Sequence, residues 1–231
     1  FFVITRPPPA SPLLPYTPPL PSPAPTLPQA TTLTEQQVLH LPFPSAQTIV
    51  MVGNQSIWRG HPDWVALYVG NHILGGGGFG SILTYVVREE KGYVYGIGSG
   101  FSPMAAAGPF TVQFSTGNDT ASDALAVTLS LIDEFVEAGP TDQQLEDAVA
   151  NIICSFPMQY AENDDIVGHL AAIAFYDLPR AYMQWFEGEV GQLTVEDVRE
   201  SMQRNLDPAN RAIVTIGPES PAPAADQTAA Q

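Results

Sequence analysis

The stretch NHILGGGGFGSILTYVVREEKGYVY, residues 71–95, governs the interpretation of this chain. An apolar segment ends in four consecutive glycines, residues 75–78, and a helical pattern then resumes and carries Arg88 to its end. Gly92 is predicted to stop that helix in the left-handed conformation, and Tyr95 lies at the start of the next strand. Glycine loses more backbone freedom on folding than any other residue, so such a run indicates a sharp turn or a close approach of another chain. A bare loop, a guanidinium and a phenol in one region are suited to holding a peptide.

Outward from this stretch, five short segments have the β-branched content or the alternation typical of strands. They are Gln37–Leu41, Thr48–Gly53, Tyr93–Phe101, Pro109–Thr116 and Arg211–Gly217. The third and fourth predict a hairpin, and in the fourth the alternation of Phe110, Val112 and Phe114 predicts one buried face.

Helical spacing and capping signals account for most of the remaining foldable chain. The predicted helices lie within 61–74, over Ser81–Lys91, from Asn118 or Thr120 to Gly139, from Thr141 to Pro157, around Ile166, Leu170 and Ile173, over Tyr182–Val190, and from Thr194 to Leu206. The strands are few and the helices are segregated between them. This order predicts an α+β domain of two layers, with helices on one face of a mostly antiparallel sheet.

The chain is expected to contain one folded domain with tails. Residues 1–33 are predicted to be a proline-rich, semi-rigid linker, because proline at this density favours extended polyproline II structure. FFVIT at residues 1–5 is interpreted as the last strand of a missing upstream domain, and an SH3-type ligand is disfavoured because basic flanks are lacking. Residues 34–217 form the predicted domain, and 218–231 a disordered tail.

The charge of the chain is strongly acidic, with 24 acidic against 8 basic residues and a formal net charge of −16. A surface of this kind repels phosphate backbones, so nucleic acid is not an expected partner. No stretch reaches the roughly 18 to 20 apolar residues that span a bilayer. The single cysteine cannot form an internal disulfide and does not identify the compartment. Among the settings that remain open, we favour the bacterial periplasm.

The residues offer little support for metal or nucleophilic chemistry. Neither H-E-x-x-H nor H-x-x-E-H occurs, so the zinc-peptidase signature is absent. Asp165 and His169 are four residues apart on a predicted helix, but two ligands without a third indicate a surface pair rather than a metal site. There is no G-x-S-x-G motif, and Cys154, on an apolar helix stripe, is expected to be an inert structural thiol. We predict that this chain binds no metal.

The glycine run also contains the pattern G-x-G-x-x-G, at Gly75, Gly77 and Gly80. A dinucleotide site would need a strand before the pattern and an acidic residue about twenty positions later. Here a helix precedes it, and no acid lies near residue 100. The match is therefore interpreted as chance.

The stretches 71–81 and 87–95 together resemble the C-terminal half of M16 zinc peptidases, the pitrilysin, insulinase and mitochondrial-processing-peptidase family. In that family this half carries N-x-I-L-G-G-G and a helix ending R-E-x-x-G-L-x-Y. The similarity extends over roughly residues 35–217. It implies a LuxS/MPP-like metallohydrolase fold built from two similar halves or subunits that enclose a chamber.

The resemblance also implies roles for particular residues. One half of the family carries H-x-x-E-H and holds the zinc and the general base, and the other supplies an Arg and a Tyr spaced R-x6-Y, which match Arg88 and Tyr95. The resemblance makes these two the expected catalytic residues, and Gly75, Gly76, Gly77, Gly78 and Phe79 the expected substrate-binding loop. The expected partners are an HxxEH-bearing half, with the zinc in that half, and a peptide or unfolded polypeptide substrate.

Two functions stay open from the sequence. The chain is either the non-zinc half of a metallopeptidase, inactive alone, or a non-catalytic M16-derived scaffold. The R-x6-Y spacing favours the first. The alternatives without a catalytic role are, for Arg88, a cation at a helix C-terminus or paired with a neighbour such as Glu89, and, for Tyr95, a half-buried strand aromatic. A departure from the family pattern, Ile82 in place of an Arg after the loop, bears on substrate preference.

Overall fold

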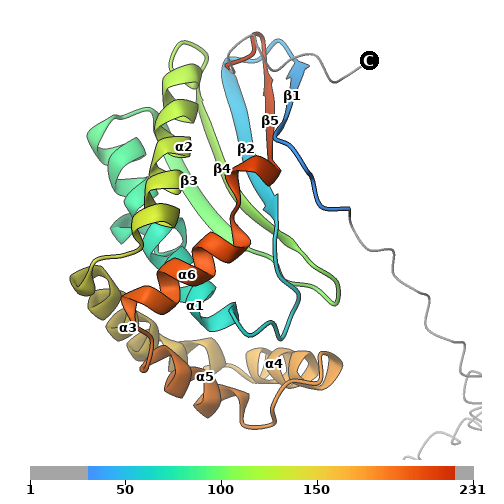
Figure 1. The fold of residues 1–231 in the computed structure, drawn as a ribbon, viewed down its shortest axis with the longest axis vertical. Coiled ribbons are helices and arrows are strands. Elements are labelled where there is room, and N and C mark those ends of the chain that lie inside the picture. Colours follow the sequence, from blue (N-terminus) through green and yellow to red (C-terminus); the bar gives the residue numbers. More distant parts are fainter. Residues whose placement is uncertain (1–30, 222–231) are drawn as a thin grey trace, which may run out of the picture.

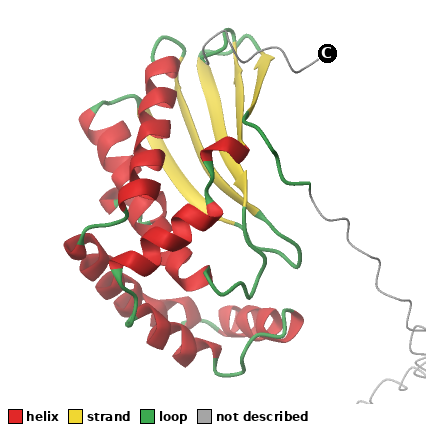
Figure 2. Ribbon diagram, in the orientation of Figure 1, coloured by secondary structure: helices red, strands yellow, loops and turns green. Residues whose placement is uncertain are grey.

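The fold is described from a computed structural model, which covers residues 31–221. The predicted strand at 1–5, most of the predicted linker and the last ten residues of the predicted tail lie outside these described residues. Figures 1 and 2 show a sheet with the helices gathered on one of its faces. The α+β prediction is confirmed.

The sheet has five strands in the order β1-β5-β2-β4-β3. The strands are β1 (Gln37–Pro42), β2 (Gln47–Gln55), β3 (Val94–Phe101), β4 (Pro109–Gly117) and β5 (Arg211–Gly217). Strand β2 pairs antiparallel with both β4 and β5, and β3 pairs antiparallel with β4. Only the β1–β5 pair among the described strands is parallel. The hairpin prediction is confirmed, since β3 and β4 are neighbours.

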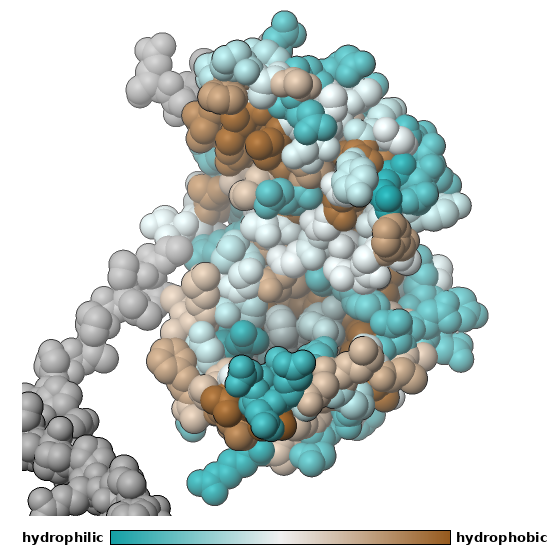
Figure 3. All heavy atoms as spheres, turned by 180° about the vertical axis from the view of Figure 1, so that it is seen from behind, coloured by the Kyte–Doolittle hydropathy of each residue, from teal (hydrophilic) through white to brown (hydrophobic). Residues whose placement is uncertain are grey.

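The two faces of the sheet differ in what covers them. On the helix side, Phe110, Val112 and Phe114 of β4 are buried as the alternation predicts. On the other side the residues of β1, β5 and β2 form rows across the strands, and Ile49, for example, pairs with Ile216. Leu39 and Ile49 are exposed there, and Figure 3 shows an apolar patch on this side of the molecule.

Eleven helical segments accompany the strands in the described chain. They are α1 (Trp64–Asn71), η1 (His72–Gly76), η2 (Gly78–Gly80), η3 (Thr84–Glu90), α2 (Ala121–Ala138), α3 (Asp142–Ser155), η4 (Phe156–Tyr160), α4 (Asn163–Phe175), α5 (Tyr182–Val190), α6 (Val195–Asn205) and η5 (Pro208–Asn210). None of these helices is long and apolar enough to cross a membrane.

Local signals placed the helix ends correctly. Thr141 and Gln144 form a capping box at the start of α3, and Thr194 caps α6 in the same way. Gly139 ends α2 with φ +72°, in the region that favours glycine. The N-cap of α2 is Thr120, but its hydroxyl makes no capping bond.

The core lies between the sheet and helices α1, α2 and α6, where Leu67, Ile132 and Met202 are almost or wholly buried. One feature differs from the sequence analysis, and one adds to it. Cys154 is exposed, so the expectation of a structural thiol on the buried stripe is wrong; the buried side of α3 carries Ile152 instead. Helix α4 exists, but none of its residues is buried.

Candidate functional site

The glycine run lies where helix α1 ends against strand β3. Helix α1 continues without a break into the π-helical turn η1. A Cβ added at Gly75 would lie 2.4 Å from Ser99 Oγ, and one at Gly77 would lie 2.5 Å from the carbonyl oxygen of His72. Both distances are too short for a Cβ contact, so these positions need glycine because other groups pack closely against them.

Polar side chains fix the two ends of the loop to β3. Ser99 Oγ donates to Asn71 Oδ1 at 2.7 Å, and Asn71 Nδ2 donates to the Ser99 carbonyl oxygen at 3.2 Å. After the loop, buried Ser81 lies 3.0 Å from Thr84 Oγ1, which donates to the carbonyl oxygen of Ile97 at 3.3 Å. The loop is therefore anchored before and after its exposed tip.

Arg88 lies in the last turn of η3, and the chain leaves that helix through Gly92 with φ +66°. The guanidinium carbon of Arg88 is 4.6 Å from the ring centroid of Phe79 and 5.6 Å from that of Tyr95. Arg88 Nη1 is also 3.2 Å from Glu89 Oε1. Two ring faces and one neighbouring carboxylate hold the guanidinium, which keeps donors available for a further acceptor.

Tyr95 projects from a β-bulge on the edge strand β3. Val94 pairs with Thr116 and Ile97 with Phe114, so two residues of β3 oppose the single Ser115 of β4. A bulge at a sheet edge re-aims a side chain. The side chain of Tyr95 is 91% exposed, so its hydroxyl is available for contact with a bound molecule.

The predicted site residues divide into two groups in space. Gly78, Phe79, Arg88 and Tyr95 line one cavity of about 220 Å³. This group comes from three segments: the loop, the end of η3 and the start of β3.

The other three glycines of the predicted loop do not line that cavity. Gly75 is buried beneath the loop, and Gly76 is exposed beside it. Gly77 lines a neighbouring hollow with His72, whose pKa is lowered by burial. The imidazole of His72 is therefore neutral near pH 7.

The functional side chains that line the 220 Å³ cavity are hydrogen-bond donors. Arg88 offers a guanidinium and Tyr95 a phenol, and no carboxylate, imidazole or thiol lines it. Nowhere in residues 31–221 do three His, Cys, Asp or Glu side chains come together as a metal would require. The arrangement can orient a peptide backbone and stabilise negative charge on an oxygen.

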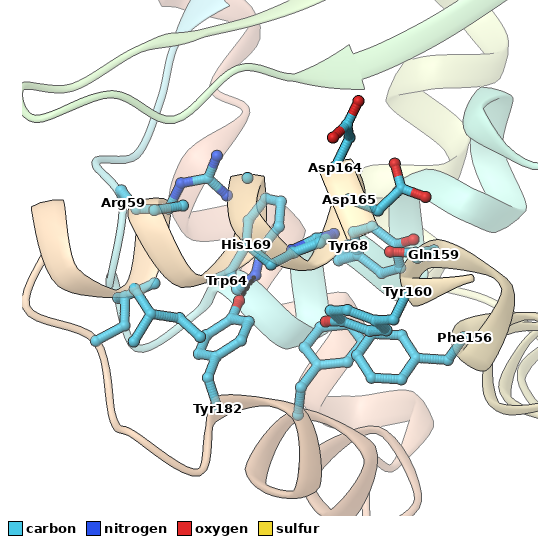
Figure 4. Close-up of a pocket in the computed structure, with 15 residues that line it drawn as sticks. Arg59, Trp64, Tyr68, Phe156, Gln159, Tyr160, Asp164, Asp165, His169 and Tyr182 are labelled. Carbon is cyan, nitrogen blue, oxygen red and sulfur yellow. Dashed lines mark hydrogen bonds between the residues drawn. The ribbon is translucent and has the colours of Figure 1, made fainter. Parts of the chain in front are cut away.

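A second and larger cavity, of about 490 Å³, was missed by the sequence analysis. It lies between helices α1, η4, α4 and α5, and Figure 4 shows its lining. Asp165 and His169, which the sequence analysis took for a surface pair, both line it. Asp165 is indeed exposed, but His169 is partly buried, with its ring centroid 4.4 Å from that of Tyr160.

A signal for this cavity was present in the sequence. Three pairs of aromatic residues, each four apart in the sequence, contribute six of the fifteen residues that line it. They are Trp64 and Tyr68, Phe156 and Tyr160, and Tyr182 and Phe186. Four-residue spacing places both rings of each pair on one helix face. The spacing alone does not say that the three faces meet.

Comparison with known proteins assigns this fold to a family. The sequence model of the family described as "Peptidase M16 inactive domain" matches residues 9–152, which is more than half of the chain. The chain therefore belongs to this family and is an inactive M16 domain of the C-terminal type. The resemblance stated from residues 71–81 and 87–95 is confirmed.

A crystal structure of a peptidase M16 inactive domain from Pseudomonas fluorescens is 38% identical, with a TM-score of 0.79 over 84% of this chain and 46% of that one. The "Non-peptidase homolog YmxG" of Helicobacter pylori is 27% identical over 57% of this chain and 31% of its own length. The chain thus spans less than half of either relative.

A putative zinc protease from Bordetella pertussis Tohama I shares the fold at 17% identity, with a TM-score of 0.62 over 74% of this chain and 93% of that one. At this level of identity the likeness concerns the fold alone.

Proposed function

We propose that this chain is the non-zinc half, or subunit, of an M16-type zinc metalloendopeptidase. In this role it provides the Arg88 guanidinium, the Tyr95 phenol and the tip of the glycine loop to a chamber that an HxxEH-bearing half completes. The substrate class is peptide or unfolded polypeptide.

The observation that supports this proposal is that Arg88 and Tyr95 lie close together. The two residues come from different elements, and the guanidinium lies 5.6 Å from the phenol ring. The bulge turns Tyr95 outward, and Phe79 covers another side of the guanidinium at 4.6 Å. The helix-terminal position and the ion pair with Glu89 account for Arg88 by themselves. A half-buried strand aromatic does not account for Tyr95, which is 91% exposed beside the partly exposed guanidinium.

The two side chains have different tasks in peptide hydrolysis. As water attacks a peptide carbonyl, negative charge grows on the oxygen, and a phenol aimed at that oxygen stabilises the transition state by a few kcal/mol. The fork of donors on Arg88 suits the carbonyl oxygens of an extended backbone, so this residue orients the bound substrate.

The metal belongs to the other half in this proposal. The described residues hold no set of three ligands, and no carboxylate, imidazole or thiol lines the 220 Å³ cavity, so zinc does not fit here. When bound in the partner half, zinc supplies the Lewis acid for the reaction.

The test is peptide cleavage by this chain combined with an HxxEH-bearing half. Tyr95→Phe removes one hydroxyl from an exposed side chain, so folding is unchanged. Loss of a transition-state donor should lower kcat by roughly 10²- to 10³-fold and leave KM nearly unchanged. Arg88→Ala should lower kcat and also raise KM, because it acts on the bound substrate.

The matched control is Tyr85→Phe. Tyr85 is also exposed, lies on η3 and does not line the cavity, so its loss should leave kcat and KM unaltered. Full activity of Tyr95→Phe, in an assembly shown to require this chain, would refute the role given to Tyr95.

The second candidate is a non-catalytic M16-derived scaffold. The relative with the printed name "Non-peptidase homolog" favours it. On this reading Arg88 and Tyr95 contact a partner protein rather than a scissile bond. Both substitutions would then weaken assembly, as measured by ultracentrifugation, and no mixture would cleave peptide.

A further inference from the structure

The 490 Å³ cavity has the size and lining of a small-molecule site, and the proposed peptidase role does not use it. Its walls come from α1, η4, α4 and α5, and the six aromatic rings of the three four-residue pairs line it (Figure 4). The rings also pack against one another. Phe156 and Phe186 stack with centroids 5.1 Å apart, and Tyr68 meets Phe186 edge-on at 5.3 Å.

One cation reaches into this aromatic cavity. The guanidinium carbon of Arg59 lies 5.6 Å from the ring centroid of Trp64 and 5.4 Å from that of Tyr176. Its Nε is buried and has no hydrogen-bond partner among the described residues. Burying a donor of this kind without an acceptor is unfavourable.

Within residues 31–221 Arg59 also has no counter-ion, which is unusual in a chain with a net charge of −16. Among the described arginines, those at 88, 199, 204 and 211 each form an ion pair with a carboxylate. Arg59 and Arg180 form none in the part of the chain that the structure covers, and Arg180 is exposed. Of these two arginines without an ion pair, Arg59 is partly buried.

The carboxylates that line the cavity do not neutralise Arg59. Asp164 and Asp165 are exposed at the start of α4, and Figure 4 shows them at the other end of the cavity from Arg59. Asp165 instead accepts a hydrogen bond from the backbone N–H of Glu162 at 3.4 Å. The guanidinium therefore faces the cavity without an acceptor from the part of the chain that the structure describes.

A further donor lies among the rings. The Tyr182 hydroxyl accepts from Trp64 Nε1 at 2.9 Å, and its own hydrogen is donated to no described residue. Burial raises the pKa of Tyr182, so the hydroxyl stays protonated at neutral pH. It can donate to an oxygen of a bound molecule.

We propose that this cavity binds a carboxylate attached to an aromatic or branched apolar group. The carboxylate would accept from Arg59 and the apolar group would pack among the rings. The ligand is a free acid of this kind or the C-terminal residue of a peptide, because both present the same chemistry. An aromatic cage can also hold a cation, but here the guanidinium of Arg59 already lies over the Trp64 ring and would repel one.

The test uses the full chain and two probes of nearly equal shape, N-acetyl-L-phenylalanine and N-acetyl-L-phenylalaninamide. Calorimetric titration should show that the acid binds and the amide binds at least about tenfold more weakly, since a hydrogen-bonded charge pair is lost. A short peptide ending in phenylalanine, with a free or an amidated C-terminus, tests the second source. Binding of the free acid alone assigns the site to small molecules, and binding of the peptide acid assigns it to a polypeptide terminus.

Arg59→Gln should reduce affinity for the acid by about 10- to 100-fold. Arg180→Gln is the matched control, because it makes the same change of charge at an exposed arginine without an ion pair, and it should bind as the wild type does. Tyr182→Phe should weaken binding by about two- to tenfold. If Arg59→Gln fails to fold by circular dichroism, Arg59→Lys, which keeps the charge but loses the fork, should bind with reduced affinity.

Three results would each overturn the proposal. They are equal binding of acid and amide, equal effects of the Arg59 and Arg180 substitutions, and no binding of either acid at millimolar concentration. None of them bears on the peptidase role, which the Tyr95 and Arg88 variants test separately.

Discussion

Two helical segments of this protein were predicted from the same kind of spacing and ended in opposite environments. In the segment after the glycine loop, Leu83 and Val87 are fully buried. In α4 no residue is buried, and Leu170 is 54% and Phe175 76% exposed. Apolar spacing thus identified both helices, but it did not tell which one the core would cover.

The difference comes from what each segment meets. The segment 82–90 contacts α2 and strand β3, and Thr84 within it donates a hydrogen bond to the carbonyl oxygen of Ile97 in β3. Helix α4 has its main contact with η4 and otherwise borders the 490 Å³ cavity. The apolar side chains of α4 border a cavity, where a ligand or a partner can bury them. The segment 82–90 is already part of the core.

The largest expected contrast is between two leucine truncations. Leu83→Ala should lower the free energy of unfolding by about 2–5 kcal/mol, because it leaves a void in a packed core. Leu170→Ala should change it by no more than about 0.5 kcal/mol, since the side chain is mostly in water. Urea denaturation of both variants gives the comparison, and an equal loss would show that α4 is packed in solution.

Two glycines give the next contrast. Gly77→Ala should cost about 1–3 kcal/mol, because its Cβ would meet the backbone carbonyl of His72, which no rotamer change can relieve. Gly168→Ala in α4 meets no atom within 4 Å and should stabilise the protein by about 0.5–1 kcal/mol through better helix propensity. The same sign for both variants in thermal unfolding would contradict the packing explanation.

The smallest expected effect is on the pH dependence of stability, and it comes from Asp63 at the start of α1. Burial alone would raise the pKa of Asp63, but hydrogen bonds from Arg204 and Asn205 outweigh it and lower that pKa. A carboxylate with a lowered pKa adds stability above its unfolded value of about 3.9, and this is lost as the pH falls through the folded pKa.

Asp63→Asn should therefore reduce stability at pH 7 by about 1 kcal/mol or less, since the pair is partly solvated. The deficit should shrink as the pH is lowered below about 4. Arg204→Gln should reproduce this profile, and a deficit that is constant from pH 7 to 3 would show that the ion pair is not its cause.

The sequence was most informative where a local rule decides the outcome. The helix ends at Gly92 and Gly139 and the helix starts at Thr141 and Thr194 depend on neighbours in the chain, and all four were predicted correctly. The bulge under Tyr95 and the exposure of Cys154 depend on the register of another strand and on which helices stack. No local pattern encodes these contacts, so they became visible only in three dimensions.

The candidate site also combines features that sequence neighbours decide with features that distant contacts decide. The R-x6-Y spacing drew attention to Arg88 and Tyr95, but Phe79 joins them over the guanidinium only because the loop folds back. The lone Arg59 gave no local signal at all. Its significance depends on a neighbouring ring, Trp64, and on one that lies more than a hundred positions later in the chain, Tyr176.

The place of strand β5 has a consequence for how the protein is made. This last strand lies between β1 and β2, two of the earliest segments of the domain, and Gln37 pairs with Ala212. A ribosome therefore releases both flanking strands long before the strand that joins them. Until Arg211–Gly217 emerges, one edge of β2 has no partner and can pair with other chains. Contacts between such distant segments also make folding slow, so the nascent domain should depend on chaperones until its final strand is in place.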